Sequence, residues 1–170
     1  MGLIVQTVIE IPQGSQNKYE YNQATGLTRL DRVLYAAMHY PVNYGFIPET
    51  WAEDDDPLDV LVFGSTAIHP LVEVDVRVIG ALLMKDEHGP DAKVVGVVDR
   101  DPRYNHISAV DDLGTHRLRE VRHFFAKYKN LQGLTTVVGN YQNVNTAVDL
   151  ITAARQRYRQ THADTGNSRV

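Results

Sequence analysis

The 170-residue chain contains no cysteine, and this absence excludes several kinds of chemistry. Disulfide bonds, thiolate nucleophiles, and zinc or iron–sulfur sites with cysteine ligands all require that residue. The chain also has no apolar run close to the roughly 20 residues of a membrane-spanning helix, and its first residues lack the basic segment and cleavage site of a signal peptide. We therefore predict a cytoplasmic protein with no membrane partner.

Positive charge is scarce as well, since 17 lysines and arginines stand against 21 aspartates and glutamates. A dedicated nucleic-acid-binding protein needs cationic surface to neutralise phosphates, so we predict no nucleic-acid partner. Small anionic substrates remain compatible with this charge if metal ions supply the positive side. The chain is 43% hydrophobic and shows no linker or repeat, which predicts one domain over residues 1–170 with a flexible polar tail at 161–170.

Apolar residues alternate with polar ones through much of the first hundred residues. From Leu3 to Ile11 the odd positions are mostly apolar, while Gln6 and Glu10 fall on the other face, which predicts a strand. The segment 71–84 alternates in the same way and places its valines at 72, 74, 76 and 78 inward. Further strands are expected at 17–22, 27–35, 59–64 and 92–98. Short strands between turns rich in Gly, Pro and Asn favour a small closed or nearly closed barrel.

The spacing of apolar residues changes to three and four near the C-terminal end. Leu118, Val121, Phe125 and Tyr128 follow this spacing within 115–130, which predicts an amphipathic helix that caps the strands. A second helix is expected over 146–160. Together the patterns predict an α+β fold, in which a barrel of short strands is flanked by C-terminal helices.

The stretch AEDDDPLDV at 52–60 carries five carboxylates in nine residues. Two carboxylates about 5 Å apart repel by roughly 3 kcal/mol at an effective dielectric of about 20, so they must protonate, turn into water or acquire cations. A solvated loop is the ordinary interpretation of an acidic run. Asp54, Asp56 and Asp59, however, lie at i, i+2 and i+5 around Pro57, and such a turn can aim several carboxylates at one point.

Oxygen ligands of this kind suit hard divalent cations. Magnesium keeps several waters and accepts only one or two protein carboxylates, so a cluster this rich suggests more than one ion. A second acidic stretch, at 84–95, contributes Asp86 and Asp91, although taken alone it is an ordinary hairpin turn.

Several cationic and phenolic side chains would complement such a site, because lysine, arginine and tyrosine can all bind phosphate oxygens. Each of them alone means little, since an isolated lysine is usually a surface residue and a tyrosine in an amphipathic helix usually belongs to the core. The candidates are Lys18, Arg32, Tyr44, Lys93, Tyr128 and Lys129.

Seven segments occur in the order and approximate spacing of one family: VIEIP, NKYEY, LDRVL, YPVNYGFIP, DDDPLDV, DEHGPDAK and HFFAKYKNL. Over about residues 8–131 the chain therefore resembles the soluble inorganic pyrophosphatases of the first, bacterial and eukaryotic family. The resemblance implies a five-stranded OB-like β-barrel with flanking helices and magnesium-dependent hydrolysis of inorganic pyrophosphate. It also implies a homo-oligomer, commonly a homohexamer.

Carried over by motif, the resemblance implies a role for each candidate. Asp56 is the base that orients or deprotonates the attacking water, with Asp91 as the second candidate for that role. Several Mg²⁺ ions would bind per site, with Mn²⁺ or Zn²⁺ as alternatives. The implied metal ligands are Glu10, Asp54, Asp59, Asp86 and Asp91, with Glu20 lining the same cavity, and the implied phosphate-binding residues are Lys18, Arg32, Tyr44, Lys93, Tyr128 and Lys129.

Some positions depart from the family pattern. Many relatives carry lysines after the position of Lys129, whereas the segment KNLQGLTTVVGNY has none there, so we predict weaker phosphate binding than in relatives. Asp55, often glycine in relatives, is interpreted as a turn residue. His88 lies beside the acidic hairpin, where it is either a hydrogen-bonding group near the cleft or a solvated turn residue.

Three other functions compete with this one. An OB-like oligonucleotide-binding module would need a basic groove in place of the acidic cluster. A structural divalent-ion protein would leave the lysines, the arginine and the tyrosines without a purpose. Another divalent-metal phosphohydrolase that acts on a small diphosphate is the alternative we keep, although neither phosphate-binding loop of the usual nucleotide enzymes is present.

Overall fold

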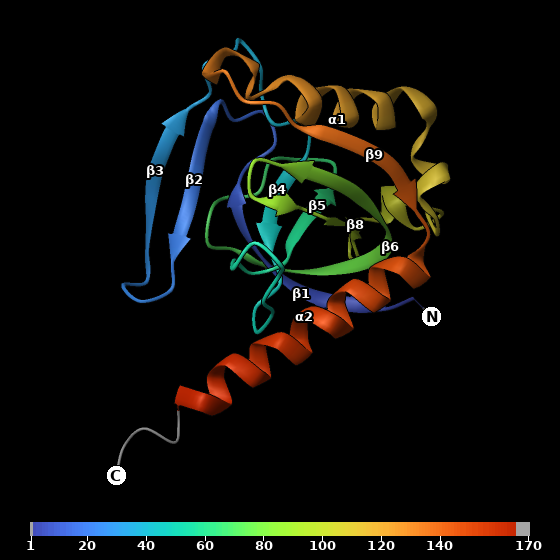
Figure 1. Ribbon diagram of the computed structural model, residues 1–170. Helices are drawn as coiled ribbons and strands as arrows, with labels where there is room; N and C mark the ends of the chain where they lie inside the picture. Colours follow the sequence, from blue (N-terminus) through green and yellow to red (C-terminus); the bar gives the residue numbers. More distant parts are fainter. Residues whose placement is uncertain (1, 166–170) are drawn as a thin grey trace.

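The computed structural model describes residues 2–165 (Figure 1). The elements follow one another as β1 (Ile4–Ile11), β2 (Asn17–Asn22), β3 (Leu27–Val33), β4 (Asn43–Phe46), β5 (Asp59–Phe63), β6 (Glu73–Asp86), β7 (Gly89–Pro90), β8 (Lys93–Val98), the 3₁₀ turns η1 (Pro102–Tyr104) and η2 (Val110–Leu113), α1 (Thr115–Lys127), η3 (Asn130–Gln132), β9 (Val137–Gln142) and α2 (Val144–Thr165). No helix within this range is long and apolar enough to cross a membrane.

Five strands form a closed ring of hydrogen bonds. The order is β1, β4, β5, β8 and β6, and β6 pairs back onto β1. β5 and β8 run parallel to each other, whereas the other pairs in the ring are antiparallel. Consequently β5 and β8 begin at the same end of the ring, and β6 ends there. The predicted α+β class, with five strands closed around a core and helices near the C-terminal end, is confirmed.

Two apolar clusters stabilise the ring from its two sides. Alternate residues of β5 enter each of them: Leu61 and Phe63 pack in the cluster that contains α1, while Val60 and Val62 pack in the cluster that contains α2. β5 is therefore buried on both faces, which is why its sequence reads as a continuous apolar run. Each such side chain stabilises the fold by about 1.5–3 kcal/mol when fully buried.

The strand and helix boundaries differ from the sequence-based expectations at several points. β4 and β9 were not predicted, and α2 is longer than expected at both ends. The first five residues of the expected tail, 161–165, have helical backbone, while residues 166–170 lie outside the described part of the chain. Val76 and Val78 face inward as predicted, but Val72 is 41% exposed because it precedes β6 and lies in a turn.

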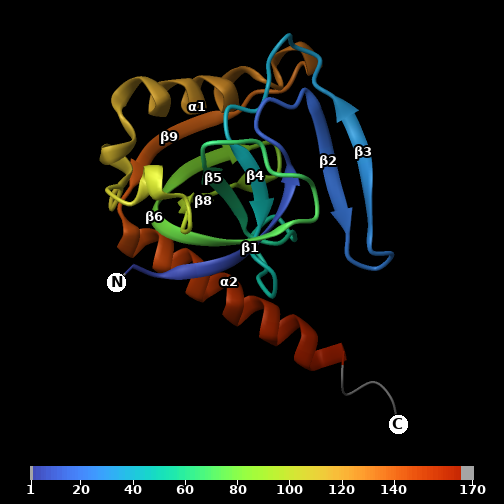
Figure 2. The same ribbon diagram turned by 180° about the vertical axis from the view of Figure 1, so that it is seen from behind.

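β2 and β3 form a separate two-stranded hairpin beside the ring (Figures 1 and 2). An isolated hairpin is marginally stable, so its position depends on contacts with the ring. The ring of Tyr21 stacks on Phe46 of β4 at 5.9 Å, and the backbone N–H of Tyr21 donates to Glu10 Oε1 at 2.8 Å. These contacts hold one side of the hairpin against the ring strands β1 and β4.

Candidate active site

A cavity of about 420 Å³ lies between the ring and the hairpin. Eight carboxylates and four lysine or arginine side chains line it, so acidic groups outnumber cationic ones. Every residue singled out from the sequence lines this cavity: Glu10, Lys18, Glu20, Arg32, Tyr44, Asp54, Asp56, Asp59, Asp86, Asp91, Lys93, Tyr128 and Lys129.

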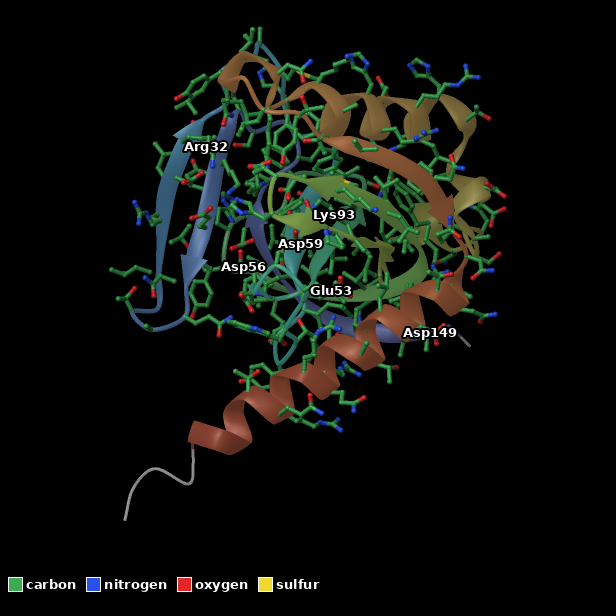
Figure 3. All side chains as sticks on the ribbon, in the orientation of Figure 1. Arg32, Glu53, Asp56, Asp59, Lys93 and Asp149 are labelled. Carbon is green, nitrogen blue, oxygen red and sulfur yellow. The ribbon has the colours of Figure 1, made fainter. Side chains whose placement is uncertain are left out.

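The parallel pair of strands explains how distant acidic segments meet. Asp59 is the first residue of β5 and Lys93 the first residue of β8, so both lie at the end of the ring where these strands begin. Asp86 is the last residue of β6, which runs in the opposite direction and ends at the same place. Figure 3 shows Asp56, Asp59 and Lys93 on the side of the ring that faces the hairpin, where Arg32 lies.

Lys93 neutralises two carboxylates of the cavity, Asp59 and Asp91. Its Nζ donates to Asp59 Oδ2 and Asp91 Oδ1, both at 2.7 Å, and to Tyr44 Oη at 3.1 Å. The Tyr44 hydroxyl in turn donates to Asp59 Oδ2 at 2.5 Å. The Lys93 side chain is only 3% exposed, so this ammonium group lies at the floor of the cavity.

The surroundings fix the protonation states of this floor. Burial alone would lower the pKa of Lys93, but the charges of Asp59 and Asp91 outweigh it and raise the pKa well above its usual value. Burial, together with the charge of Asp59, raises the pKa of Tyr44 well above its usual value. At neutral pH the floor therefore presents a charged ammonium and a neutral phenol, both of which are hydrogen-bond donors.

Lys129, just after α1, forms a second ion-pair group with the hairpin turn between β6 and β8. Its Nζ donates to Asp86 Oδ2 at 2.9 Å and to Glu87 Oε1 at 3.0 Å. Burial raises the pKa of Asp86, but the hydrogen bond from Lys129 outweighs it, so the net shift is downward. The backbone N–H of His88 also donates to Asp86, while the His88 imidazole is 73% exposed.

The hairpin carries its own charged group. Lys18 Nζ donates to Glu20 Oε1 at 2.5 Å and to Asp31 Oδ2 at 3.4 Å, and Arg32 Nε donates to the same Asp31 oxygen at 2.6 Å. Burial opposes the charge on Lys18, but the hydrogen bond and charge of Glu20 raise its pKa. Lys18 and Arg32 are therefore held charged on the side of the cavity opposite Lys93.

Three carboxylates at the cavity have no cationic partner among the described residues: Glu10, Asp54 and Asp56. Burial and then the charge of Asp59 raise the pKa of Asp54 to about 6. Burial is also the largest cause for Glu10, whose pKa rises to about 7 although the Tyr21 N–H donates to it. Burial and Asp59 likewise raise the pKa of Asp56. These groups resist ionisation in the absence of added positive charge.

A tight turn presents Asp54 and Asp56 to the cavity. Asp55 between them adopts a positive φ of 65° and points away, where its carboxylate accepts a hydrogen bond from Trp51 Nε1. This geometry agrees with the interpretation of Asp55 as a turn residue. The Ala52 N–H donates to the Asp56 carbonyl at 2.7 Å and closes the turn.

The same turn is anchored to the C-terminal helix. The backbone N–H of Trp51 donates to the Ala154 carbonyl of α2 at 3.0 Å. Arg157 Nε of α2 donates back to the Trp51 carbonyl at 2.9 Å. The position of the acidic turn therefore depends on α2 as well as on β5.

Comparison with known proteins decides the family. The model of the inorganic pyrophosphatase family matches residues 7–159. The chain belongs to the inorganic pyrophosphatase family. The inorganic pyrophosphatase of Geobacillus stearothermophilus is 45% identical over 157 residues, which are 92% of this chain and 95% of that protein. The crystal structure of inorganic pyrophosphatase from Thermus thermophilus superposes with a TM-score of 0.89 at 46% identity and covers 92% of this chain and 91% of that one.

The donor chemistry of this pyrophosphatase-family cavity fits divalent cations, although no preformed cage is present. Among the described residues no three His, Cys, Asp or Glu side chains gather closely enough to hold an ion. The ammonium groups of Lys93 and Lys129 already pair with the carboxylates of Asp59, Asp91, Asp86 and Glu87. Magnesium binds with one or two carboxylates, waters and substrate oxygens, so it needs no three-residue cage. Glu10, Asp54 and Asp56 have no ion-pair partner among the described residues, so their carboxylate oxygens can serve as ligands for such cations.

Sequence reasoning did not single out two residues that shape this site. The Asp31 carboxylate accepts hydrogen bonds from both Lys18 and Arg32. In a regular strand Asp31 and its neighbour Arg32 would point to opposite faces of the sheet and would not meet in this way. A register shift between β2 and β3 leaves Asp31 without a partner position and brings the two side chains together. Gln132 of η3 also lines the cavity. The sequence offered one indirect signal for it, because Gln132 lies in the segment after Lys129 that contains no lysine.

Proposed function

We propose that the chain hydrolyses inorganic pyrophosphate to two phosphates with the help of divalent cations, Mg²⁺ first among them. Membership of the inorganic pyrophosphatase family supports the reaction. The observation that carries the proposal is the cavity itself, in which four cationic side chains face a larger number of carboxylates. Because the substrate is an anion, this excess of acidic groups needs cations from solution before substrate can bind.

The residues proposed to hold these cations are Glu10, Asp54, Asp59, Asp86 and Asp91. Divalent cations bound there would neutralise phosphoryl oxygens and lower the pKa of a water molecule toward neutrality. Mn²⁺ and Zn²⁺ are alternatives to Mg²⁺, since both accept carboxylate ligands.

The chain's own cationic and phenolic groups would hold the substrate. Lys18, Arg32 and Lys129 reach the cavity from three different segments and can bind phosphoryl oxygens on different sides. Tyr128 is buried and Tyr44 is partly buried, and desolvation raises the pKa of both phenols, so they remain neutral donors at physiological pH. Donors that are fixed before the substrate arrives stabilise the charge that develops on the leaving phosphate.

Asp56 is the proposed general base. As the water oxygen bonds to phosphorus, its proton would pass to the Asp56 carboxylate while the bond from phosphorus to the bridging oxygen breaks and the second phosphate departs. Burial raises the pKa of Asp56, which makes it a better proton acceptor, and no ion pair competes for it among the described residues. Asp91 already accepts a hydrogen bond from Lys93 at 2.7 Å and is the second candidate.

Measurement of phosphate release tests the proposal. We expect rapid release from pyrophosphate with Mg²⁺, loss of activity in excess EDTA, and recovery when Mg²⁺ is restored. ADP in the same assay tests the alternative of a phosphohydrolase for other small diphosphates. Release from ADP at a higher kcat/KM than from pyrophosphate would favour that alternative, and no release from either substrate would refute both.

The homohexamer and the cytoplasmic location stay predictions that depend on the family resemblance. Light scattering coupled to gel filtration would measure the assembly directly. A mass near 115 kDa, six times the chain mass of 19.1 kDa, is the expected result. A mass close to that of one chain would refute the hexamer.

A further inference from the structure

Two acceptors fix the guanidinium group of Arg32 from two sides. Arg32 Nε donates to Asp31 Oδ2 at 2.6 Å, and its Nη1 donates to Gln132 Oε1 at 2.5 Å. Asp31 is the neighbouring residue on the hairpin, whereas Gln132 lies 100 residues away in η3, after α1. The contact with Gln132 is thus the one that fixes Arg32 relative to the far wall of the cavity.

The geometry of the guanidinium makes this second contact important. The group is planar and carries five N–H donors in a rigid fork that matches two phosphate oxygens at once. With Nε held only by Asp31, the end of the group could still swing with the side chain. Gln132 also accepts at Nη1, so the two contacts together fix the orientation of the guanidinium plane.

Gln132 also connects the hairpin to the segment that follows α1. β2 and β3 form a separate sheet, and Tyr21 attaches one part of it to Glu10 and Phe46. Arg32 pairs with Lys18 near the opposite end of the hairpin, so the Gln132 contact holds that end. It thereby also fixes the distance between Lys18 on the hairpin and Lys129 near η3.

The side chain of Gln132 has no competing role among the described residues. Its Nε2 is closed off from solvent and has no hydrogen-bond partner, so Oε1 makes its one side-chain hydrogen bond there. The amide is also uncharged. It orients Arg32 without neutralising it, and the positive charge stays available to an anion.

We propose that Gln132 is a positioning residue for Arg32, which it orients to bind a phosphoryl group of the substrate. This inference rests on the proposed hydrolysis of pyrophosphate. The segment 130–141 contains no lysine, so orientation of Arg32 by Gln132 is the contribution to phosphate binding that we assign to it.

Steady-state kinetics with pyrophosphate and saturating Mg²⁺ test the role. Gln132→Met keeps the length of the side chain and removes the acceptor, and we expect it to raise KM by about tenfold, with kcat changed by less than about threefold. Gln156→Met makes the same change at an exposed position on α2 and should leave both constants unchanged.

A double-mutant cycle separates positioning from a general structural effect. If Gln132 acts through Arg32, then Gln132→Met should change KM by less than about twofold in an Arg32→Ala background. Thermal unfolding should stay within about 3 °C of wild type in Gln132→Met. If that variant unfolds earlier, Gln132→Asn, which is polar but too short to reach Arg32, should show the same rise in KM.

Two results would overturn the inference: an unchanged KM in Gln132→Met, or an equal effect of that substitution with and without Arg32. Absence of pyrophosphate hydrolysis by the wild-type protein is a different outcome, because it would refute the proposed function itself.

Discussion

Two groups of carboxylates face the same cavity under opposite conditions. Asp59 and Asp91, at the start of β5 and before β8, share the buried ammonium of Lys93. Glu10, Asp54 and Asp56 have no cation among the described residues, and the pKa of each is raised. The ring thus carries its own counter-ion, whereas the turn and the end of β1 depend on ions from solution. We therefore expect loss of Lys93 to affect the stability of the fold most, and loss of a carboxylate in the second group to affect activity most.

The largest expected effect concerns the group without a counter-ion. Asp56→Asn should lower kcat by about 10²–10⁴-fold, because it removes a proton acceptor but keeps the shape of the side chain. Metal uptake, measured by Mg²⁺ titration, and the unfolding midpoint should stay close to wild type.

Asp55→Asn is the matched control for that substitution. Asp55 lies in the same turn but does not line the cavity, so kcat should not change. Near-normal turnover in Asp56→Asn would assign the base role to another residue, with Asp91 examined next.

The second prediction tests the internal counter-ion. Lys93→Met should lower the free energy of unfolding by about 3–5 kcal/mol in EDTA, because it leaves two aspartates close together without a cation. Lys18→Met removes a more exposed lysine, at 24% exposure, and should cost about 1 kcal/mol or less. Urea denaturation of both variants measures the difference, and equal losses would contradict the distinction between the two groups.

The third prediction uses pH. Burial raises the pKa of Glu10 from its usual 4.5 to about 7, so the folded protein binds this proton more tightly than the unfolded chain does. Ionisation of Glu10 therefore destabilises the fold above pH 7, and this destabilisation disappears as the pH falls from 7 to 4.5. In EDTA, Glu10→Gln should be more stable than wild type by about 2 kcal/mol at pH 8 and equal to it near pH 4.5.

Thermal or urea unfolding across this pH range measures the difference between the two proteins. The Gln side chain keeps an acceptor for the Tyr21 N–H, so the comparison isolates the charge. A constant difference at all pH values would show that the charge of Glu10 does not destabilise the cavity. Saturating Mg²⁺ should abolish or reverse the advantage of Glu10→Gln.

The smallest effect separates this chain from its relatives. Because no lysine follows Lys129 in the segment up to 141, we expect the KM for pyrophosphate to be a few-fold higher than that of family members that carry lysines there, under matched conditions. A KM equal to or lower than that of those family members would contradict the prediction.

Much of the fold followed from local patterns. The alternation in β2 and β6 and the helical spacing in α1 specify these elements by themselves. The candidate residues were found through motifs, and the cavity contains every one of them. Their roles as ligands, donors and base remain predictions for the experiments above.

The rest depends on irregular pairing that no local pattern contains. A register shift in β1 between Ile9 and Ile11 breaks the alternation. It moves Ile11 from the cluster of Val5 and Ile9 to the cluster under α1. A second shift at Asp31 joins Lys18 and Arg32. Such bulges depend on the partner strand, so they become visible only once the strands are paired. The contact of Arg32 with Gln132 is similarly invisible, because 100 residues separate the two.

The attachment of Trp51 to α2 has a consequence for biosynthesis. Ala154 and Arg157, which hold the segment before Asp54, are made about a hundred residues after it. On the ribosome the ring strands can therefore pair while the acidic turn still lacks its final support. A nascent chain that stops before residue 154 should form its β-strands but bind divalent cations more weakly than the full-length chain.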